Sequence, residues 1–478
     1  MLSNLIEEIL HPDSIAVVGA TQARGWGGGG FVESLIELNF KGKIYPVNPK
    51  YSEIMGLKAF PSLRDIEGTI DYVISSVPAT AVPGMLNDAA EKGVKTVHLF
   101  TARFSETGRP EAIELEQKIL ELARGYGIRL IGPNCMGIYY PLGGMAFHAD
   151  FPKQSGMAGL SSQSGMLSRE LILTSAQRGI YFSKVFSYGN AVDLNECDFL
   201  EYLAQDPETR LIMLYVEGVK DGRRFFKTLK QAASVKPVIV LKGGLAQAGA
   251  RATASHTASL AGSQQIWKAA VAQAGAVWAD SFEELIDLAA SFYFLPPAGG
   301  RRVGVIGGTG GTSVLAADRC EQAGLEVIPL PAEFREELKN RGVSVWDWLS
   351  NPVDLSIRED DSFSAGLILE MMAKDPNFDL LITLSGIRER PAAGPGATPE
   401  ESLRQQYRLD ACRNKPLLIV VPENSAGIKD WDGRGAKMNA EMRTALINLK
   451  VPFYPTVSRA AVAASKFADY YRRLESNR

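Results

Sequence analysis

The chain has 478 residues, 46% of them hydrophobic, and its 54 acidic and 51 basic side chains give a net charge of -3. This length exceeds what one hydrophobic core supports, so we expect two to four domains. The charges are interspersed without a long basic block, which argues against a nucleic-acid-binding protein or one that lies on a membrane surface. No positively charged stretch precedes an apolar run at the N-terminus, and no apolar run is long enough to span a bilayer. The four cysteines are scattered without a CxxC pair, which favours reduced thiols in a cytoplasmic protein over disulfides or a zinc site.

Short β-branched runs alternate with longer amphipathic stretches, which predicts an α/β fold with parallel sheets covered by helices. In the first part of the chain, strands are predicted at residues 14–20, 43–49, 71–78, 96–100 and 129–134. A second series of strands and helices begins at Met157, and a third follows the Pro- and Gly-rich stretch at 295–302. We therefore predict three domains, over residues 1–148, 149–294 and 300–478.

Each predicted domain opens with a strand, a tight turn of small residues and a helix. The three turns are GATQARGWGGGG (19–30), SSQSG (161–165) and GGTGGTS (307–313). The N–H groups of a helix's first turn have no internal partner and the helix dipole is positive there, so small residues allow an anion to approach. Each turn is either a phosphate site or an ordinary joint of a doubly wound fold. The candidate phosphate-binding residues are Ser162, Ser164, Gly165, Gly308, Gly310 and Gly311.

The first turn could hold a dinucleotide, but the residues after the second predicted strand argue against NAD. A dinucleotide-binding fold places an acid after that strand to bind a ribose hydroxyl. Here the strand ends in Val47 and Asn48, and Lys50 stands where the acid should be. A basic side chain at this position favours a nucleotide that carries an additional phosphate group. NADP also carries one, so an NADP site stays open as an alternative.

His256 is one of only four histidines and lies among small residues in the segment ARATASHTASLAGS. A buried structural histidine usually has bulky neighbours, whereas a histidine among small residues can approach a ligand closely. Glu217 follows an apolar strand, at the end where α/β folds place their sites. Its carboxylate can hold one imidazole nitrogen and make the other more nucleophilic. His11, His98 and His148 have no metal-like spacing, so we interpret them as structural and expect no metal site.

Taken together, the motifs resemble the α-type subunit of NDP-forming acyl-CoA synthetases, the family of ADP-forming acetyl-CoA synthetase and succinyl-CoA synthetase. The resemblance runs in order along nearly the whole chain, through IYPVNPKYSEIMG, IGPNCMG, SSQSGML, FSYGNAVDL and ASHTASLAGS. It implies a Rossmann-like CoA-binding domain at 1–148, followed by two flavodoxin-like doubly wound domains. The first of these, 149–294, would carry a phosphohistidine loop, and the second, 300–478, would carry the last glycine turn.

The resemblance also implies roles for the site residues. His256 would be the phosphohistidine, Glu217 would orient it, and the two later helix N-termini would face it from opposite sides. The implied CoA-binding residues are Gly19, Thr21, Asn48, Lys50, Val77, Pro78, Asn134 and Cys135. For Cys135, packing near the thioester is favoured over nucleophilic attack. Two features depart from the family pattern, namely the glycine-rich stretch WGGGG at 26–30 and Arg103, where relatives commonly have glycine.

The implied reaction interconverts acyl-CoA, ADP and phosphate with a carboxylic acid, CoA and ATP, through an acyl phosphate and a phosphohistidine. Every segment of the chain is already assigned to one of the three predicted domains, which leaves no room for an ATP-grasp fold. The resemblance therefore implies that this fold, which holds ATP or ADP with Mg²⁺, lies on a separate β-type subunit of a hetero-oligomer. Two alternatives stay open: a CoA-binding protein of this fold without catalysis, and an NADP oxidoreductase, for which the sequence offers no hydride-transfer residues. Residues 387–406 are expected to form a long exposed loop.

Overall fold

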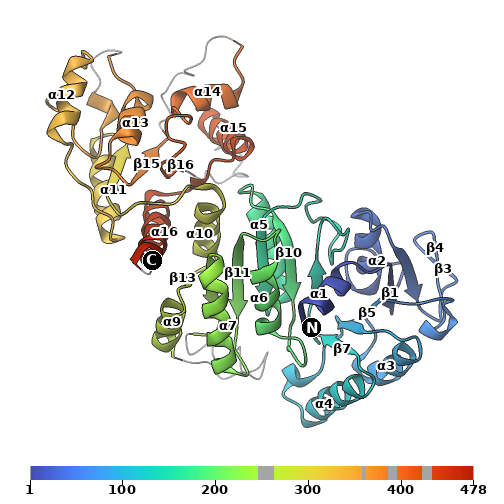
Figure 1. Ribbon diagram of the computed structural model, residues 1–478. Helices are drawn as coiled ribbons and strands as arrows, with labels where there is room; N and C mark the ends of the chain where they lie inside the picture. Colours follow the sequence, from blue (N-terminus) through green and yellow to red (C-terminus); the bar gives the residue numbers. More distant parts are fainter. Residues whose placement is uncertain (1, 246–262, 358–361, 386–395, 423–432, 477–478) are drawn as a thin grey trace. The chain divides into compact units, whose positions relative to one another are not determined.

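The computed structural model describes residues 2–245, 263–357, 362–385, 396–422 and 433–476. It divides into two compact units, Met1–Leu285 and Ile286–Arg478 (Figure 1). The first unit holds two main sheets and the second unit holds one, and these sheets are parallel apart from one edge strand. The predicted α/β fold with parallel sheets is confirmed. None of the described helices is long and apolar enough to cross a membrane.

The first sheet has the strand order β2-β1-β5-β6-β7, and neighbouring strands are parallel. Its strands are β1 (Ser14–Val18), β2 (Lys43–Val47), β5 (Tyr72–Ser75), β6 (Thr96–Leu99) and β7 (Arg129–Ile131), and a hairpin of β3 (Glu53–Ile54) and β4 (Leu57–Lys58) follows β2. Its helices are α1 (Leu2–Leu10), α2 (Gly27–Glu37), α3 (Val82–Glu91) and α4 (Pro110–Gly125). All residues of β1, β5 and β6 are buried, as in strands covered on both faces. The strand order reverses at β1, and such sheets bind ligands near this point, at the carboxyl ends of the strands.

The second sheet has the order β8-β10-β9-β11-β12-β13, in which only β8 is antiparallel. Its strands are β8 (Gly137–Tyr139), β9 (Ala158–Ser162), β10 (Phe182–Ser187), β11 (Leu211–Val216), β12 (Val238–Lys242) and β13 (Val277–Ala279). Its helices are α5 (Gly165–Ala176), α6 (Glu196–Gln205), α7 (Gly222–Val235) and α9 (Gln264–Gln273). Helix α10 (Phe282–Phe294) begins in the first unit and continues into the second. Here the order reverses at β9. Strand β8 lies in the range predicted for the first domain but pairs with β10, so the first two predicted domains interlock.

Polar side chains also join the two sheets of the first unit. The Tyr202 hydroxyl on α6 donates to Glu7 Oε1 on α1 at 2.7 Å. The Arg129 guanidinium at the start of β7 donates to both carboxylate oxygens of Asp193, at 2.7 and 3.1 Å. These contacts join the two sheets of the first unit to each other.

The second unit has the strand order β14-β15-β16-β17, all parallel. Its strands are β14 (Val303–Ile306), β15 (Leu380–Leu384), β16 (Leu417–Val420) and β17 (Phe453–Tyr454). Its helices are α11 (Gly310–Gln322), α12 (Ala332–Asn340), α13 (Ala365–Lys374), α14 (Pro399–Gln406), α15 (Arg434–Leu449) and α16 (Val457–Ser476). On the free side of β14 only isolated bridges form, from Arg302 to Glu326 and from Ile306 to Val353. In the described part of this unit, the sheet predicted to be flavodoxin-like therefore has isolated bridges in the place where a further regular strand would pair with β14.

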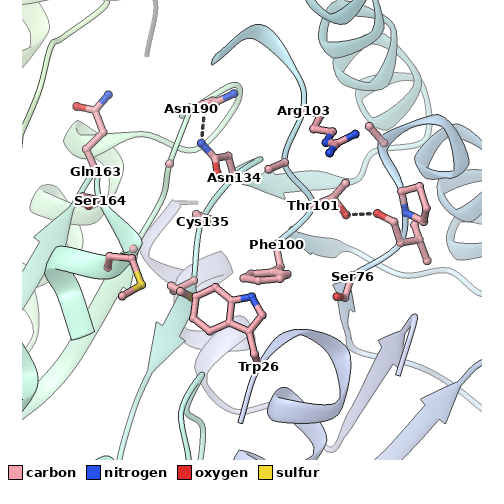
Figure 2. A pocket seen from close by; sticks show the side chains of 18 of the residues that line it. Trp26, Ser76, Phe100, Thr101, Arg103, Asn134, Cys135, Gln163, Ser164 and Asn190 are labelled. Carbon is pink, nitrogen blue, oxygen red and sulfur yellow. Dashed lines mark hydrogen bonds between the residues drawn. The ribbon is translucent and has the colours of Figure 1, made fainter. Parts of the chain in front are cut away.

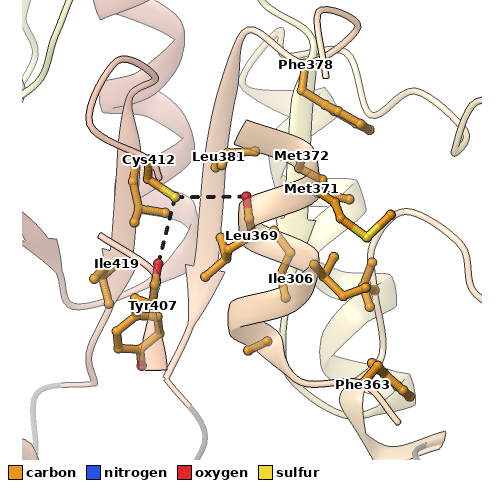
Figure 3. Packing of buried hydrophobic residues seen from close by; sticks show 14 of the residues in the cluster. Ile306, Phe363, Leu369, Met371, Met372, Phe378, Leu381, Tyr407, Cys412 and Ile419 are labelled. Carbon is orange, nitrogen blue, oxygen red and sulfur yellow. Dashed lines mark hydrogen bonds between the residues drawn. The ribbon is translucent and has the colours of Figure 1, made fainter. Parts of the chain in front are cut away.

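The core of the second unit lies between its sheet and helix α13. Ile306, Leu381 and Ile419 come from three successive strands of the sheet and belong to one buried cluster with Met371 and Met372 of α13 (Figure 3). All of these side chains are buried, most of them completely. This packing positions the carboxyl end of β14, and with it the glycine turn that begins α11.

The predicted exposed loop at 387–406 is wrong in its second half, because α14 occupies Pro399–Gln406. Thr398 is the N-cap, and its hydroxyl accepts from Glu401 N at 3.2 Å, while the Glu401 carboxylate accepts from Thr398 N at 2.9 Å. This reciprocal cap, with Pro399 in the first turn, is a helix-start signal that the sequence contains. Residues 386–395 lie outside the described part of the chain.

Candidate active site

A pocket of about 870 Å³ opens in the first unit at the carboxyl ends of its two sheets (Figure 2). Its walls come from the loops after β1, β5, β6 and β7 on one side and after β9, β10 and β11 on the other. The predicted site residues in its lining are Val77, Pro78, Asn134, Cys135, Ser164, Gly165 and Glu217. Residues predicted to bind CoA and residues predicted to bind phosphate therefore face one space.

The wall built by the first sheet is held together by backbone contacts between its loops. The Thr101 hydroxyl donates to the carbonyl of Val77 at 2.8 Å, and Asn134 N donates to the carbonyl of Thr101 at 3.0 Å. On the opposite wall, Gly189 has a φ of +57°, and a Cβ there would lie 2.2 Å from the carbonyl oxygen of Pro133. Only glycine allows this close approach, which brings the two walls together beside Asn134.

The glycine-rich stretch at 26–30, a departure from the family pattern, has a packing reason. A Cβ on Gly28 would lie 2.3 Å from the carbonyl oxygen of Gly19, and one on Gly29 would lie 1.8 Å from that of Ala23. The first turn of α2 therefore packs directly on the backbone of the preceding loop. This packing leaves Trp26 half-exposed in the pocket wall, with its ring edge-on to Phe100 at a centroid distance of 5.6 Å (Figure 2).

Helix α5 begins at Gly165 directly after β9, and Ser164 is its N-cap. The Ser164 hydroxyl accepts from a backbone N–H of the first turn at 3.3 Å, and the Ser164 carbonyl accepts from Ser168 N at 3.1 Å. The N–H groups of Gly165 and Met166 therefore have no acceptor within the helix, and the dipole is positive there. The Ser162 hydroxyl donates to the Ser164 carbonyl at 2.9 Å, so it supports the turn without lining the pocket.

Glu217 lines the same pocket from the end of β11. The Tyr215 hydroxyl donates to Glu217 Oε1 at 3.1 Å, and Gln163 Oε1 accepts from Glu217 N at 2.7 Å and from Gly218 N at 3.2 Å. The buried Lys242 ammonium donates to the Glu217 carbonyl at 2.8 Å. Burial lowers the pKa of Lys242, and the Glu217 charge opposes that shift. Glu217 Oε2 accepts no hydrogen bond from any residue that the structure describes.

Cys135 lines the pocket with little of its thiol exposed. Its side chain is 3% exposed, its Sγ lies 3.7 Å from the Leu99 carbonyl, and burial raises the pKa of the thiol far above its usual range. His98 Nε2 donates to the Cys135 carbonyl at 3.1 Å, and burial lowers the pKa of His98 to about 4. At neutral pH the thiol is therefore protonated and the imidazole uncharged.

Asn190, from the loop after β10, connects the two walls. Its Nδ2 donates to Glu106 Oε2 at 2.7 Å and to Glu116 Oε2 at 2.8 Å, and its Oδ1 accepts from Asn134 Nδ2 at 3.4 Å. Glu116 is buried. The loop after β6 is thereby fixed to the second sheet, next to Asn134 (Figure 2).

Several predicted residues lie elsewhere. The pocket lining does not include Gly19, Thr21, Asn48, Lys50 or Ser162. The Asn48 side chain instead donates to the carbonyl of Ala20 at 2.8 Å and shapes the first turn, beside the exposed Lys50. Gly308, Gly310 and Gly311 belong to the second unit, where Gly308 lies in the turn before α11 and Gly310 and Gly311 are the first residues of that helix. His256 lies outside the described residues.

Comparison with known proteins identifies the family. A CoA binding domain model matches residues 13–141, and a model of the succinyl-CoA ligase like flavodoxin domain matches residues 155–292. The α subunit of acetate–CoA ligase [ADP-forming] II of Pyrococcus furiosus is 38% identical over 424 residues, covering 87% of this chain and 90% of the relative. The chain belongs to the NDP-forming acyl-CoA synthetase family. Both the resemblance and the predicted order of a CoA-binding domain and a flavodoxin-like ligase domain are confirmed.

Other members of the family match over different lengths. Acetate–CoA ligase [ADP-forming] of Methanocaldococcus jannaschii is 40% identical over 352 residues, covering 73% of this chain and 49% of the relative. This chain therefore spans about half the length of that relative. Among solved structures, acetyl-coenzyme A synthetase 1 of Ca. Korarchaeum cryptofilum, in complex with phosphate and ADP, matches with a TM-score of 0.81 and 30% identity, covering 98% of this chain and 97% of that one.

Part of the pocket lining was not predicted from the sequence. Residues that line it without having been predicted include Trp26, Phe100, Thr101, Met136, Gln163, Met166 and Asn190. Gln163 stands between two predicted residues in SSQSG, and Asn190 stands in the family motif FSYGNAVDL, so both had a local signal. Trp26 and Phe100 had none, because their place depends on how α2 packs on its own loop.

Proposed function

We propose that this chain is the α-type subunit of an ADP-forming acyl-CoA ligase, which interconverts acyl-CoA, ADP and phosphate with a carboxylic acid, CoA and ATP. The observation that carries the proposal is the single pocket in which Val77, Pro78 and Asn134 face Gly165 and Glu217. A thioester held along the first wall would meet a phosphate held at the second. The four cysteines are free and buried, which fits a reducing compartment, and we place the protein in the cytoplasm.

In the first step, a phosphate oxygen attacks the thioester carbonyl, the C–S bond breaks, and CoA leaves as a thiolate that takes up a proton. The products are an acyl phosphate and free CoA. The N–H groups of Gly165 and Met166 would hold the phosphate, because they have no acceptor within α5. Cys135 would not act as an anion in this step, because its thiol is buried and protonated.

In the second step, an imidazole nitrogen of His256 attacks the phosphorus, and the P–O bond to the acyl group breaks to release the carboxylate. Glu217 would hold the other imidazole nitrogen. Its Oε1 is already bound by Tyr215, and its Oε2 accepts nothing from the described residues, so Oε2 is the oxygen that a histidine N–H would meet. The carboxylate would stabilise the cationic ring that forms during the transfer.

In the third step, the phosphoryl group would pass from His256 to ADP on a separate ATP-grasp subunit, which would also hold Mg²⁺. The P. furiosus relative named as a subunit alpha matches this chain over 90% of its own length. We expect the purified chain alone to make no acyl-CoA from ATP, CoA and a carboxylic acid, and the cognate ATP-grasp subunit to restore turnover. ATP-dependent synthesis by the chain alone would contradict this division of labour.

Calorimetric titration of the full chain with CoA, NADH and NADPH tests the cofactor assignment. We expect CoA to bind and the two nicotinamide cofactors to bind without comparable affinity. Tight NADPH binding without CoA binding would overturn the proposal. CoA binding combined with no phosphorylation, even with the partner present, would indicate instead a CoA-binding protein without catalysis.

A further inference from the structure

Arg103 has a backbone conformation that arginine rarely adopts. Its φ is +79°, in the left-handed region that favours glycine. The conformation is imposed by Glu106, whose carboxylate accepts from Arg103 N at 2.5 Å and from Phe104 N at 3.1 Å. Glu106 is itself held by Asn190 at 2.7 Å. Strain of this kind persists where the surroundings enforce it and is concentrated at functional sites.

The Arg103 side chain is a free cation in the pocket wall. It lines the pocket, and its guanidinium forms no ion pair or hydrogen bond with any residue that the structure describes. Figure 2 shows it beside Thr101, on the wall that carries the predicted CoA residues. The other charged side chain in the lining, Glu217, comes from the opposite sheet. A guanidinium presents several N–H donors in a planar fork that fits a carboxylate or a phosphate.

The strand order indicates which part of a ligand Arg103 would meet. Arg103 lies just beyond β6, which pairs with β5 on one side and β7 on the other. The residues predicted near the thioester, Asn134 and Cys135, follow β7, one strand away. The first glycine turn follows β1, which is two strands away on the other side. Since neighbouring strands lie about 4.8 Å apart, the strand that leads to Arg103 is one spacing from β7 and two spacings from β1, which favours a ligand group near the thioester.

We propose that Arg103 binds an oxyanion of the acyl-CoA ligand, and that this oxyanion is a second carboxylate on the acyl group. This inference rests on the proposed function, since it takes the pocket as the CoA site. The chain would then prefer dicarboxylic acids over acids with an uncharged tail. A phosphate of CoA itself offers the same chemistry and is the other source that the experiment separates.

The test is calorimetric titration of the full chain with succinyl-CoA, butyryl-CoA and CoA. Succinyl-CoA and butyryl-CoA have acyl chains of equal length and differ at the terminal carboxylate. We expect Arg103→Gly to weaken succinyl-CoA binding about 10- to 100-fold, as for loss of a charge-assisted hydrogen bond, and to leave butyryl-CoA nearly unchanged. Arg103→Lys should fall in between, because it keeps the charge and loses the fork.

Arg109→Ala is the matched control, since Arg109 is exposed, lies on the same segment and does not line the pocket. Arg103→Gly should also raise the unfolding temperature, because glycine adopts the left-handed conformation without strain. A raised unfolding temperature would show that the weaker binding does not come from misfolding. Equal weakening of all three ligands would overturn the carboxylate assignment in favour of a CoA phosphate. Unchanged affinities in Arg103→Gly would overturn the site. If the unmodified chain bound none of the three, the proposed function would fail first.

Discussion

The turn that begins α5 and the turn that begins α11 have similar sequences and different surroundings. The α5 turn lies in a pocket whose other walls carry Glu217 and Asn134. The α11 turn is open, with Gly311 exposed and two apolar side chains of the next turn, Val314 and Leu315, 63% and 58% exposed. The described residues of the second unit therefore do not enclose the α11 turn.

The polar groups of the two turns also differ. At α11, Thr309 N donates to Thr312 Oγ1 at 2.6 Å, and the same hydroxyl donates to the Thr309 carbonyl at 2.7 Å. At α5, Gln163 reaches across to the end of β11 and accepts from Glu217 N. A helix N-terminus after a strand is thus only a potential anion site. Glu217 and Asn134 from neighbouring strands line the pocket at the α5 turn, whereas the nearest carboxylate at the α11 turn, Asp354, is already bound by Ser356. We expect the first arrangement to form the reaction site.

The largest expected effect concerns the carboxylate of the α5 site. Glu217→Gln should slow the labelling of the chain by ³²P-phosphate in the presence of acyl-CoA by about 10²–10⁴-fold, because an amide cannot stabilise a cationic imidazole. Asp354→Asn is the comparison at the α11 turn, where the Asp354 carboxylate already accepts from Ser356 N at 2.7 Å. We expect a much smaller change there. Equal losses in the two variants would contradict the distinction between the turns.

The second prediction compares one added methyl group at each turn. A Cβ on Gly165 would lie 2.6 Å from Met136 Cγ, whereas a Cβ on Gly311 would meet nothing within 4 Å. Gly165→Ala should displace the N–H groups that we propose to bind phosphate and slow labelling by about 10²-fold, as when an anion-binding donor is lost. Gly311→Ala should change labelling by no more than a few fold. Circular dichroism would establish that both variants are folded.

The third prediction uses pH to separate the two units. Burial lowers the pKa of His98 to about 4, so the unfolded chain binds its proton at higher pH than the folded chain does. The stability of the first unit should fall by about 3 kcal/mol as pH drops from 6.5 to 4, with no further loss from His98 below that. The second unit contains no histidine and lacks this contribution.

Thermal unfolding by calorimetry between pH 4 and pH 7 would measure this loss of stability in the first unit. His98→Gln can still donate to the Cys135 carbonyl but has no proton to gain, so its pH dependence in this range should be flatter. A profile identical to that of the unmodified chain would show that His98 does not titrate as its burial requires.

The smallest expected effect concerns Cys135. Its thiol is buried and protonated at neutral pH, so it supplies packing within the pocket wall. Cys135→Ser should keep labelling within about threefold, in line with a small buried substitution, and iodoacetamide should modify Cys135 slowly in the folded chain. A loss as large as that of Glu217→Gln would make the thiol a participant in the chemistry.

The sequence was sufficient for the sheets and for the core of the pocket, for reasons that lie in local patterns. Apolar runs such as SIAVV are buried on both faces, and each ends in a turn whose small residues mark the carboxyl edge of a parallel sheet. Family motifs supplied Asn134, Ser164 and Glu217, and the structure brings all three to one pocket.

The remainder depends on contacts between segments distant in sequence. Strand β8 crosses from the first predicted domain into the second sheet, and α10 continues across the division between the two units. No local pattern predicts either of these. Asn190 joins the walls through Glu106 and Glu116, more than 70 residues away in the chain. Such partners become visible only when the two sheets are placed side by side.

The most direct test of the central claim is phosphorylation of His256. Incubated with acyl-CoA and ³²P-labelled phosphate, with the ATP-grasp subunit added, the chain should acquire label that is acid-labile and base-stable, unlike phosphate on the neighbouring Ser255 or Ser259. In His256→Asn the label should vanish while calorimetry shows that CoA still binds. If His256→Asn carried acid-labile phosphate at the level of the unmodified chain, the assignment of His256 as the phosphoryl carrier would be wrong.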